Sequence, residues 1–426
     1  MANWPILVLI LLIVALFTSS AGMPTICGIG ALAILVFSGV HDSDLLAHVA
    51  PIAANVLVIM GVTQLAIQHM LRGGIGERVS ICIATLATHR LAYRIPASIL
   101  LPGIFIPATM ILAMFMHNIG AIAILTCLCI DLSRRYHTTP TPTLCAMLIA
   151  SNLGGASWAT GDTPAVIQRQ YWGFTPAQFA VAMLPRNLIV LLVLTLFACF
   201  VAWLSDKCRK TDWSDTLKRL KARDDIRRQS RYQMANSKDA WIGTLALSAF
   251  IFLQFVFPKL SLATGSLVFV ALVLLTPSDK RTKAFFALGL DATLVITSLF
   301  IVAGAVEQTP FVADLAEWLG QHRIPGLIEI AAYVLTIAIS ADGAAATLAP
   351  LVHSFSGGTM ISAWQLASGI CSGSSSLLTS ASAGPVLNSI SKQANCELTY
   401  RKYAGFGLAF SFVMLVIYLA INFIVR

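Results

Sequence analysis

The sequence predicts an all-α polytopic membrane protein with two inverted-topology repeats. Each repeat has five transmembrane helices, one re-entrant hairpin and a helix unwound at mid-membrane. Three observations predict this fold: the composition, two polar breaks inside apolar runs, and the placement of basic residues. Of the 426 residues, 57% are hydrophobic and 11% are charged. Soluble domains carry about 25% charged residues, so the apolar surface of this chain must face lipid.

Ten apolar runs have the length and composition of membrane-spanning helices. A bilayer core of about 30 Å requires about 20 such residues per helix. The runs are Trp4–Phe17, Pro24–Val40, Pro51–Met70, Thr143–Tyr171, Phe179–Leu204, Ala240–Phe257, Leu262–Thr276, Ala284–Val306, Ser362–Ser391 and Tyr403–Val425.

Two further apolar stretches contain a polar, glycine-bearing break. Residues 96–132 are interrupted at His117–Gly120, and residues 326–355 are interrupted at Ser340–Gly343. Lipid cannot satisfy the backbone groups that such a break frees, so the break must be buried in protein. Both stretches are therefore predicted to be re-entrant hairpins with the break at the tip.

The order of elements indicates a duplication. Residues 1–205 form the first predicted repeat, with its unwound helix at 143–171, and residues 240–426 form the second, with its unwound helix at 362–391. His117 aligns with Asp342 and Pro164 with Pro385, at offsets of 225 and 221 residues. Five spans per repeat, an odd number, make the two halves inverted.

Basic residues fix the orientation. Residues 206–239 form a loop with eleven bases and six acids, which supplies +5 of the formal net charge of +9. With this loop in the cytoplasm, 23 of the 28 basic residues fall on the cytoplasmic side. Bases confined to loops between apolar runs favour orientation and contact with membrane lipids over nucleic-acid binding. The expected location is the bacterial inner membrane.

Two spans contain segments that cannot remain straight helices. Ser151–Gly155 and Thr160–Pro164 lie in the first, and Cys371–Ser376 lies at the matching place in the second. Glycine costs about 1 kcal/mol and proline about 3 kcal/mol in a helix interior. Unwinding would expose helix ends that bind ions at mid-membrane. The alternative is a kinked helix that packs small residues against its neighbours.

Three titratable residues are candidates for ion binding. Asp162 and Asp342 stand at membrane depth, where a carboxylate costs about 2.5 to 3.5 kcal/mol and usually has a partner, an ion or a proton. Asp162 could instead cap a half-helix. His117 could relay protons or be a hydrogen-bonded core residue. The nine cysteines form no CxxC pair and are interpreted as small core residues.

These motifs resemble the arsenite-permease and sodium/proton-antiporter branch of the ion transporter superfamily, which also contains citrate and dicarboxylate carriers. Met116–Gly120, Ala150–Ala156 and Gly161–Pro164 carry the resemblance. It implies a substrate and ion site at the hairpin tips and unwound helices. The implied residues are His117, Asn118, Ser151, Asn152, Gly154, Gly155, Thr160, Asp162, Thr163, Asp342, Gly343, Thr347, Ser372, Gly373 and Ser374.

The expected function is secondary active transport of a small inorganic ion, by cation/proton antiport or arsenite-like oxyanion efflux driven by a proton or sodium gradient. A sodium- or proton-coupled citrate or dicarboxylate carrier is the alternative, and a non-transporting receptor or scaffold is the alternative of another class. An enzyme is not expected, because the aspartates lack the Gly-x-Gly-Asp and Tyr-Asp settings of an intramembrane protease. Neither a cofactor nor a metal is expected beyond bound sodium at the same residues. A homodimer is left open.

Overall fold

The computed structural model describes residues 75–87, 95–136, 138–158, 162–207, 237–256, 261–275, 326–381, 383–396 and 398–424. It also describes residues 5–8, 10–11, 28–34 and single positions between 58 and 73 and between 298 and 314. Most residues of the spans predicted before residue 75 and at 284–306, and most of the basic loop, lie outside the described residues. In the described part, all regular secondary structure is α-helical.

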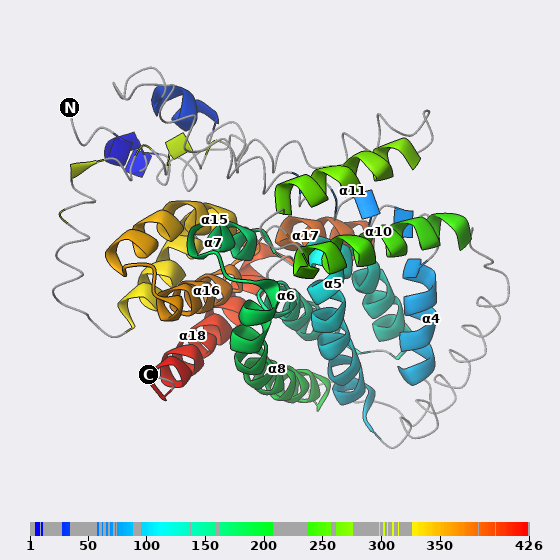
Figure 1. The fold of residues 1–426 in the computed structure, drawn as a ribbon. Helices are drawn as coiled ribbons and strands as arrows, with labels where there is room; N and C mark the ends of the chain where they lie inside the picture. Colours follow the sequence, from blue (N-terminus) through cyan, green and yellow to red (C-terminus); the bar gives the residue numbers. More distant parts are fainter. Residues whose placement is uncertain are drawn as a thin grey trace.

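The described helices form two series, and α5 to α8 follow the same order as α15 to α18 (Figure 1). The first series is α4 Ile75–Ala87, α5 Ala97–Arg135, α6 Thr141–Gly155, α7 Thr163–Trp172 and α8 Pro176–Lys207. The second is α10 Ser237–Val256, α11 Ser261–Leu275, α15 Leu327–Phe355, α16 Met360–Ser374, α17 Ala383–Gln393 and α18 Tyr400–Ile424. A long helix, two short helices separated by a break, and a final long helix therefore occur in each half.

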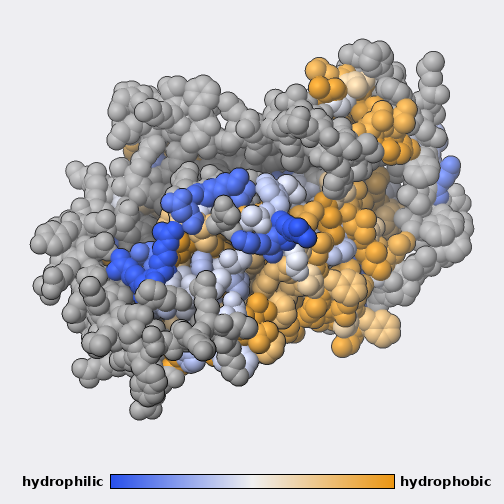
Figure 2. All heavy atoms as spheres, turned by 180° about the vertical axis from the view of Figure 1, so that it is seen from behind, coloured by the Kyte–Doolittle hydropathy of each residue, from blue (hydrophilic) through white to orange (hydrophobic). Residues whose placement is uncertain are grey.

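Three described segments are long and apolar enough to cross a membrane: Ala97–Phe115 in α5, Pro176–Ser205 in α8 and Tyr400–Ile424 in α18. Large apolar side chains on these helices point away from the protein; Val181 on α8 is 78% exposed and Phe412 on α18 is 60% exposed. Figure 2 shows hydrophobic side chains gathered on one side of the molecule. Water would penalise such a surface, whereas lipid accepts it, so the chain is an integral membrane protein.

The two series exchange packing partners. Helix α6 packs on α5, and α16 packs on α15, within each half. Helix α7, however, packs on α15, and α17 packs on α5. In each half, the first short helix therefore packs on the long helix of its own half and the second packs on the long helix of the other half. This packing places the α6–α7 and α16–α17 breaks at the centre of the molecule.

The two long helices differ at their predicted breaks. Helix α5 is helical at every residue from Ala97 to Arg135, including His117–Gly120, although the side chain of His117 lies outside the described part. Helix α15 contains a backbone break at Ser340, with φ 78° and ψ 166°. A positive φ is uncommon for serine, and it frees the amide of Ala341, which donates to the carbonyl of Ser380 at 2.9 Å.

A buried hydrogen-bond network joins α8 to α18 and to the end of α6. The Asn187 amide nitrogen donates to the carbonyl of Leu153 at 3.0 Å and to the Ser157 hydroxyl at 2.9 Å. The Tyr418 hydroxyl donates to the Asn187 amide oxygen at 2.6 Å. Because Asn187 and Tyr418 are fully buried, this network holds the end of a half-helix against the two long spans.

The second half contains a matching network around Ser411 of α18. The Ser376 hydroxyl, just past the end of α16, donates to the Ser411 hydroxyl at 2.8 Å, and Tyr333 of α15 lies 3.1 Å from the same oxygen. Ser157 and Ser376 hold the same place relative to α6 and α16. In both halves, therefore, the long helix that follows the broken span contributes a polar side chain that anchors the break.

We predict that Asn187→Ala destabilises the protein by about 1 to 3 kcal/mol, because it leaves the buried Tyr418 hydroxyl and Leu153 carbonyl without this partner. Thermal unfolding in detergent measures the effect. Thr195→Val is the control, since the Thr195 hydroxyl donates to the Leu191 carbonyl within its own helix. Equal unfolding temperatures for the two variants would contradict the anchoring role.

Candidate functional site

The ends of α6 and α16 meet at the centre of the molecule. The Asn152 amide nitrogen donates to the carbonyl of Ser374 at 3.1 Å and lies 3.4 Å from the Ser375 hydroxyl. In return, the Cys371 thiol lies 3.8 Å from the carbonyl of Asn152. The C-terminal ends of helices carry partial negative charge. Two such ends therefore converge from the two halves of the chain.

Helix α7 begins close to this meeting point, on the far side of the break after α6. Asp162 is its N-cap, and its carboxylate accepts a hydrogen bond from the amide of Thr163 at 3.0 Å. Pro164 follows in the first turn, where its missing N–H costs nothing. The capping role that was an alternative for Asp162 is therefore present, and it leaves the second carboxylate oxygen for another partner.

Two glycines at the end of α6 allow this close approach. A Cβ on Gly155 would lie 3.0 Å from the Cβ of Asp162 and 3.2 Å from its carboxylate. A Cβ on Gly154 would lie 2.3 Å from the carbonyl oxygen of Met110 on α5. In the second half, a Cβ on Gly373 would collide with Thr336 of α15 at 2.5 Å. Each glycine thus permits packing that a larger residue would prevent.

The two aspartates lie near each other. The Asn118 side chain is within hydrogen-bonding reach of the Asp162 carboxylate, and Asp342 is close enough to interact with it electrostatically. Asp162 is buried and Asp342 is half-buried, two residues beyond the break at Ser340. Like charges in a poorly solvated site repel strongly, so this pair favours a bound cation or proton.

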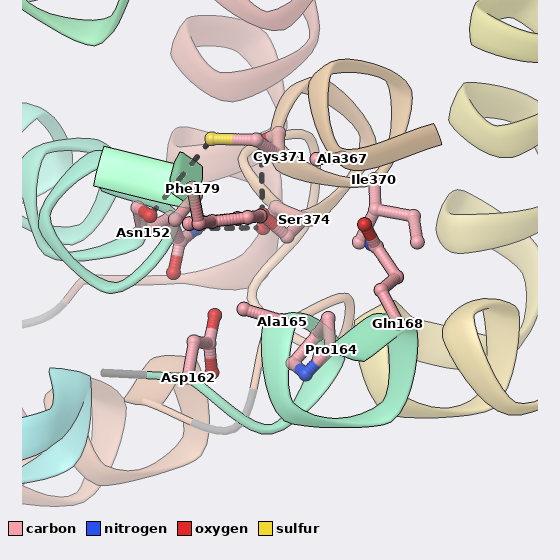
Figure 3. Close-up of a pocket in the computed structure, with 11 residues that line it drawn as sticks. Asn152, Asp162, Pro164, Ala165, Gln168, Phe179, Ala367, Ile370, Cys371 and Ser374 are labelled. Carbon is pink, nitrogen blue, oxygen red and sulfur yellow. Dashed lines mark hydrogen bonds between the residues drawn. The ribbon is translucent and has the colours of Figure 1, made fainter. Parts of the chain in front are cut away.

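A pocket lies beside Asp162 (Figure 3). It encloses about 290 Å³, part of it open to the outside, and in this conformation it accommodates about one water-sized particle. The lining residues are Asn152, Ala156, Asp162, Pro164, Ala165, Gln168, Phe179, Ala367, Ile370, Cys371 and Ser374. They come from α6, α7, α8 and α16, and they include one carboxylate but no lysine or arginine.

Several buried oxygens around the site have no hydrogen-bond partner in the described part of the chain. They are the amide oxygens of Asn118, Asn152 and Gln168 and the hydroxyls of Thr347 and Ser380. Buried polar atoms are normally paired, and an unpaired one calls for an explanation such as a bound ion or ligand. The three amide oxygens can only accept hydrogen bonds, and the two hydroxyls can accept or donate, so the site is suited to cations and to ligand groups that donate.

The structure brings part of the predicted site together. Asn118, Asn152, Gly155, Asp162, Asp342 and Ser374 lie at or beside the meeting of the broken helices. Gly154 and Gly373 pack α6 and α16 against the long helices, and Thr163 contributes its backbone amide. Gly343 and Thr347 are buried on α15 but do not line the pocket. Thr160 and the side chain of His117 lie outside the described residues.

Two predicted serines contact their own helices instead of the pocket. The Ser151 hydroxyl donates to the carbonyl of Leu148 at 2.7 Å, and the Ser372 hydroxyl donates to the carbonyl of Ser368 at 2.9 Å. Conversely, Gln168, Phe179 and Ile370 line the pocket but were not among the residues predicted for the site. Gln168 could have been found, because it lies four residues after Pro164 and hence on the same face of α7.

Comparison with known proteins places the chain among transporters. The family model CitMHS, described as citrate transporter, matches residues 7–373. The magnetosome protein MamN of Magnetospirillum gryphiswaldense is 27% identical over 305 residues, which cover 65% of this chain and 67% of MamN. A 46 kDa membrane protein of Mycobacterium leprae is 23% identical over 444 residues, which cover 96% of each chain.

The fold is similar to that of the YdaH transporter of Alcanivorax borkumensis, whose topology is described as unusual. The TM-score is 0.54 at 13% sequence identity, and the match covers 89% of this chain and 86% of that one. The family match supports the citrate-carrier side of the predicted superfamily, and gives no support to its arsenite-permease and sodium/proton-antiporter branch. It also favours the organic-anion alternative over inorganic ion exchange.

We predict that Gly155→Ala lowers ligand affinity at least tenfold, because the new methyl group pushes against the Asp162 carboxylate that borders the pocket. Binding to the purified protein measures the effect. Gly103→Ala is the control, since its Cβ would meet nothing within 4 Å. If both variants bound ligand as the wild type does, the Gly155–Asp162 contact would have no part in binding.

Proposed function

Since the chain belongs to the CitMHS citrate transporter family, we propose that it is a secondary carrier of a citrate-like organic anion that crosses the membrane together with cations. The family match supports a citrate-like substrate. The charge of the site supports coupling to cations, because the pocket contains Asp162, lies near Asp342 and has no lysine or arginine among the described residues that line it.

Charge repulsion in the site explains why cations must accompany the anion. Two unit charges 4 Å apart interact by about 4 kcal/mol at an effective dielectric constant of 20. A polycarboxylate beside Asp162 and Asp342 would therefore be repelled unless protons or metal ions offset the charge. The N-terminus of α7 contributes about half a positive charge, which is too little alone. The anion is accordingly expected to bind as a cation complex or together with coupling ions.

We propose that α5, although helical at every residue, bends near its middle into the predicted first hairpin. A straight helix of 39 residues would be about 58 Å long, about twice the bilayer core. The Ile99 carbonyl lies 3.5 Å from the Cys199 thiol near the C-terminal end of α8, and Arg134 donates to the carbonyl of Ala394. Both ends of α5 would then face the cytoplasm, with Asn118 at the tip beside Asp162.

The contacts of α15 support a second hairpin that opens outward. Near its start, Glu329 accepts from the amide of Asn422 at 3.2 Å, close to the end of α18. Near its end, the His353 ring packs edge-on against Trp172, the last residue of α7. The break at Ser340 lies between them. Two hairpins with opposite openings and adjacent tips are the arrangement expected of an inverted-repeat carrier.

The narrow pocket fits an occluded step of such a cycle. Space for about one water-sized particle does not admit citrate, so the hairpins or half-helices must separate before the anion enters. Helix α7 packs on α15, and α17 packs on α5. Movement of one hairpin would thus displace the half-helix of the other repeat, which links opening on one side to closure on the other.

Cation/proton antiport is the second candidate. The observation that favours it is the oxygen-rich, acidic site with its narrow pocket, which suits a small cation without any anion. The two functions differ in a flux assay, since only the first requires citrate.

We predict saturable citrate uptake into proteoliposomes that depends on an added divalent cation, sodium or a proton gradient. Asp162→Asn should lower this uptake at least tenfold, because it removes a carboxylate that holds the cation. Asp131→Asn is the control, since Asp131 is exposed and forms an ion pair with Arg135 of its own helix. Cation exchange without citrate transport would favour the second candidate, and full activity of Asp162→Asn would contradict the carboxylate role.

A further inference from the structure

Gln168 is a buried polar side chain that nothing in the proposed coupling mechanism uses. It lies on α7 six residues after the cap, is 1% exposed and lines the pocket. Its amide oxygen has no hydrogen-bond partner among the described residues. A carboxamide loses its water on burial, so an unpaired one is costly unless a ligand supplies the missing hydrogen bond.

The position of Gln168 separates it from the acidic part of the site. In Figure 3, Asp162 and Gln168 lie on opposite sides of Pro164 and Ala165, and Gln168 extends from α7 toward Ile370 of α16. Pro164 and Gln168 are one helical turn apart, which places both on the pocket side of α7. The pocket therefore has a charged end at Asp162 and a neutral hydrogen-bonding end at Gln168.

We propose that Gln168 recognises the hydroxyl group of a hydroxylated polycarboxylate. This inference rests on the proposed function, because it assumes that the pocket takes an organic acid. The amide oxygen accepts the hydroxyl hydrogen, and the amide nitrogen can donate to a neighbouring carboxylate of the same ligand. The cation-bearing carboxylates then lie toward Asp162, and the hydroxyl-bearing carbon lies toward Gln168.

The chemistry predicts selectivity for the hydroxyl. A site that is built to pair with a ligand hydroxyl rejects the analogue without it, because its own polar group then stays unpaired. Citrate and tricarballylate form a suitable pair, since tricarballylate is citrate without the hydroxyl. The wild-type protein should bind citrate at least about tenfold more tightly, and Gln168→Leu should remove most of that difference by weakening citrate alone.

The test measures dissociation constants of both acids for the purified full-length protein, each at fixed magnesium, sodium and pH. Gln168→Leu is compared with Gln168→Met, which keeps the side-chain length if the branched residue disturbs folding. Gln365→Leu is the matched control, since Gln365 is a buried glutamine on α16 that does not line the pocket. Thermal unfolding of each variant confirms that it is folded.

A citrate preference that disappears in both Gln168 variants and persists in Gln365→Leu supports the proposal. A preference that survives in a folded Gln168 variant overturns it, while citrate binding itself leaves the proposed function standing. Wild-type protein that binds neither acid overturns the proposed function, and with it the role of Gln168.

Discussion

The need to satisfy backbone groups inside a membrane governs this structure. Helices α6 and α16 end at its centre, where lipid offers no hydrogen-bond partner. Asn152 reaches across the repeat to the carbonyl of Ser374, and Asp162 caps the first amide of α7. Polar groups on α8 and α18 anchor the residues just beyond each half-helix. Other elements of the fold thus stabilise the helix ends. Polar residues at the ends of α6 and α16 and at the start of α7 line one pocket.

This arrangement explains why acids and small residues occur together at the site. A carboxylate at membrane depth requires a partner, and Asp162 has the α7 N-terminus on one side and Asn118 on the other. Gly155 supplies the space in which that carboxylate approaches α6. The same compactness makes the pocket too narrow for a polycarboxylate in this conformation, so the proposed transport would require the packed halves to separate.

The sequence predicted the helical membrane fold and an interruption in each of the two polar spans, because these depend on local rules. The exact positions differ: Ser151–Gly155 is helical and the interruption follows it, and α5 is helical at the predicted tip His117–Gly120. The sequence itself shows the length of each apolar run. It also shows the Gly-Gly pair before an Asp-Thr-Pro segment and the acids within apolar runs. The roles of Ser151 and Gln168 could not be predicted in this way. Whether a helical serine bonds to its own helix, or a glutamine lines a pocket, depends on the packing of α7 against α16. The choice of a citrate-like anion among the alternatives is a proposal that rests on the family match alone.

The central claim is that the ligand binds where the two broken spans meet. It is tested most directly by thiol labelling of a cysteine introduced at Ala165, in a protein whose native cysteines are replaced, during exposure to citrate and its cation. Ala165 lines the pocket, and Thr399, exposed before α18, is the comparison position. We expect citrate to protect Ala165→Cys from labelling and to leave Thr399→Cys reactive. Unchanged labelling at Ala165→Cys in a protein that still transports citrate would contradict it.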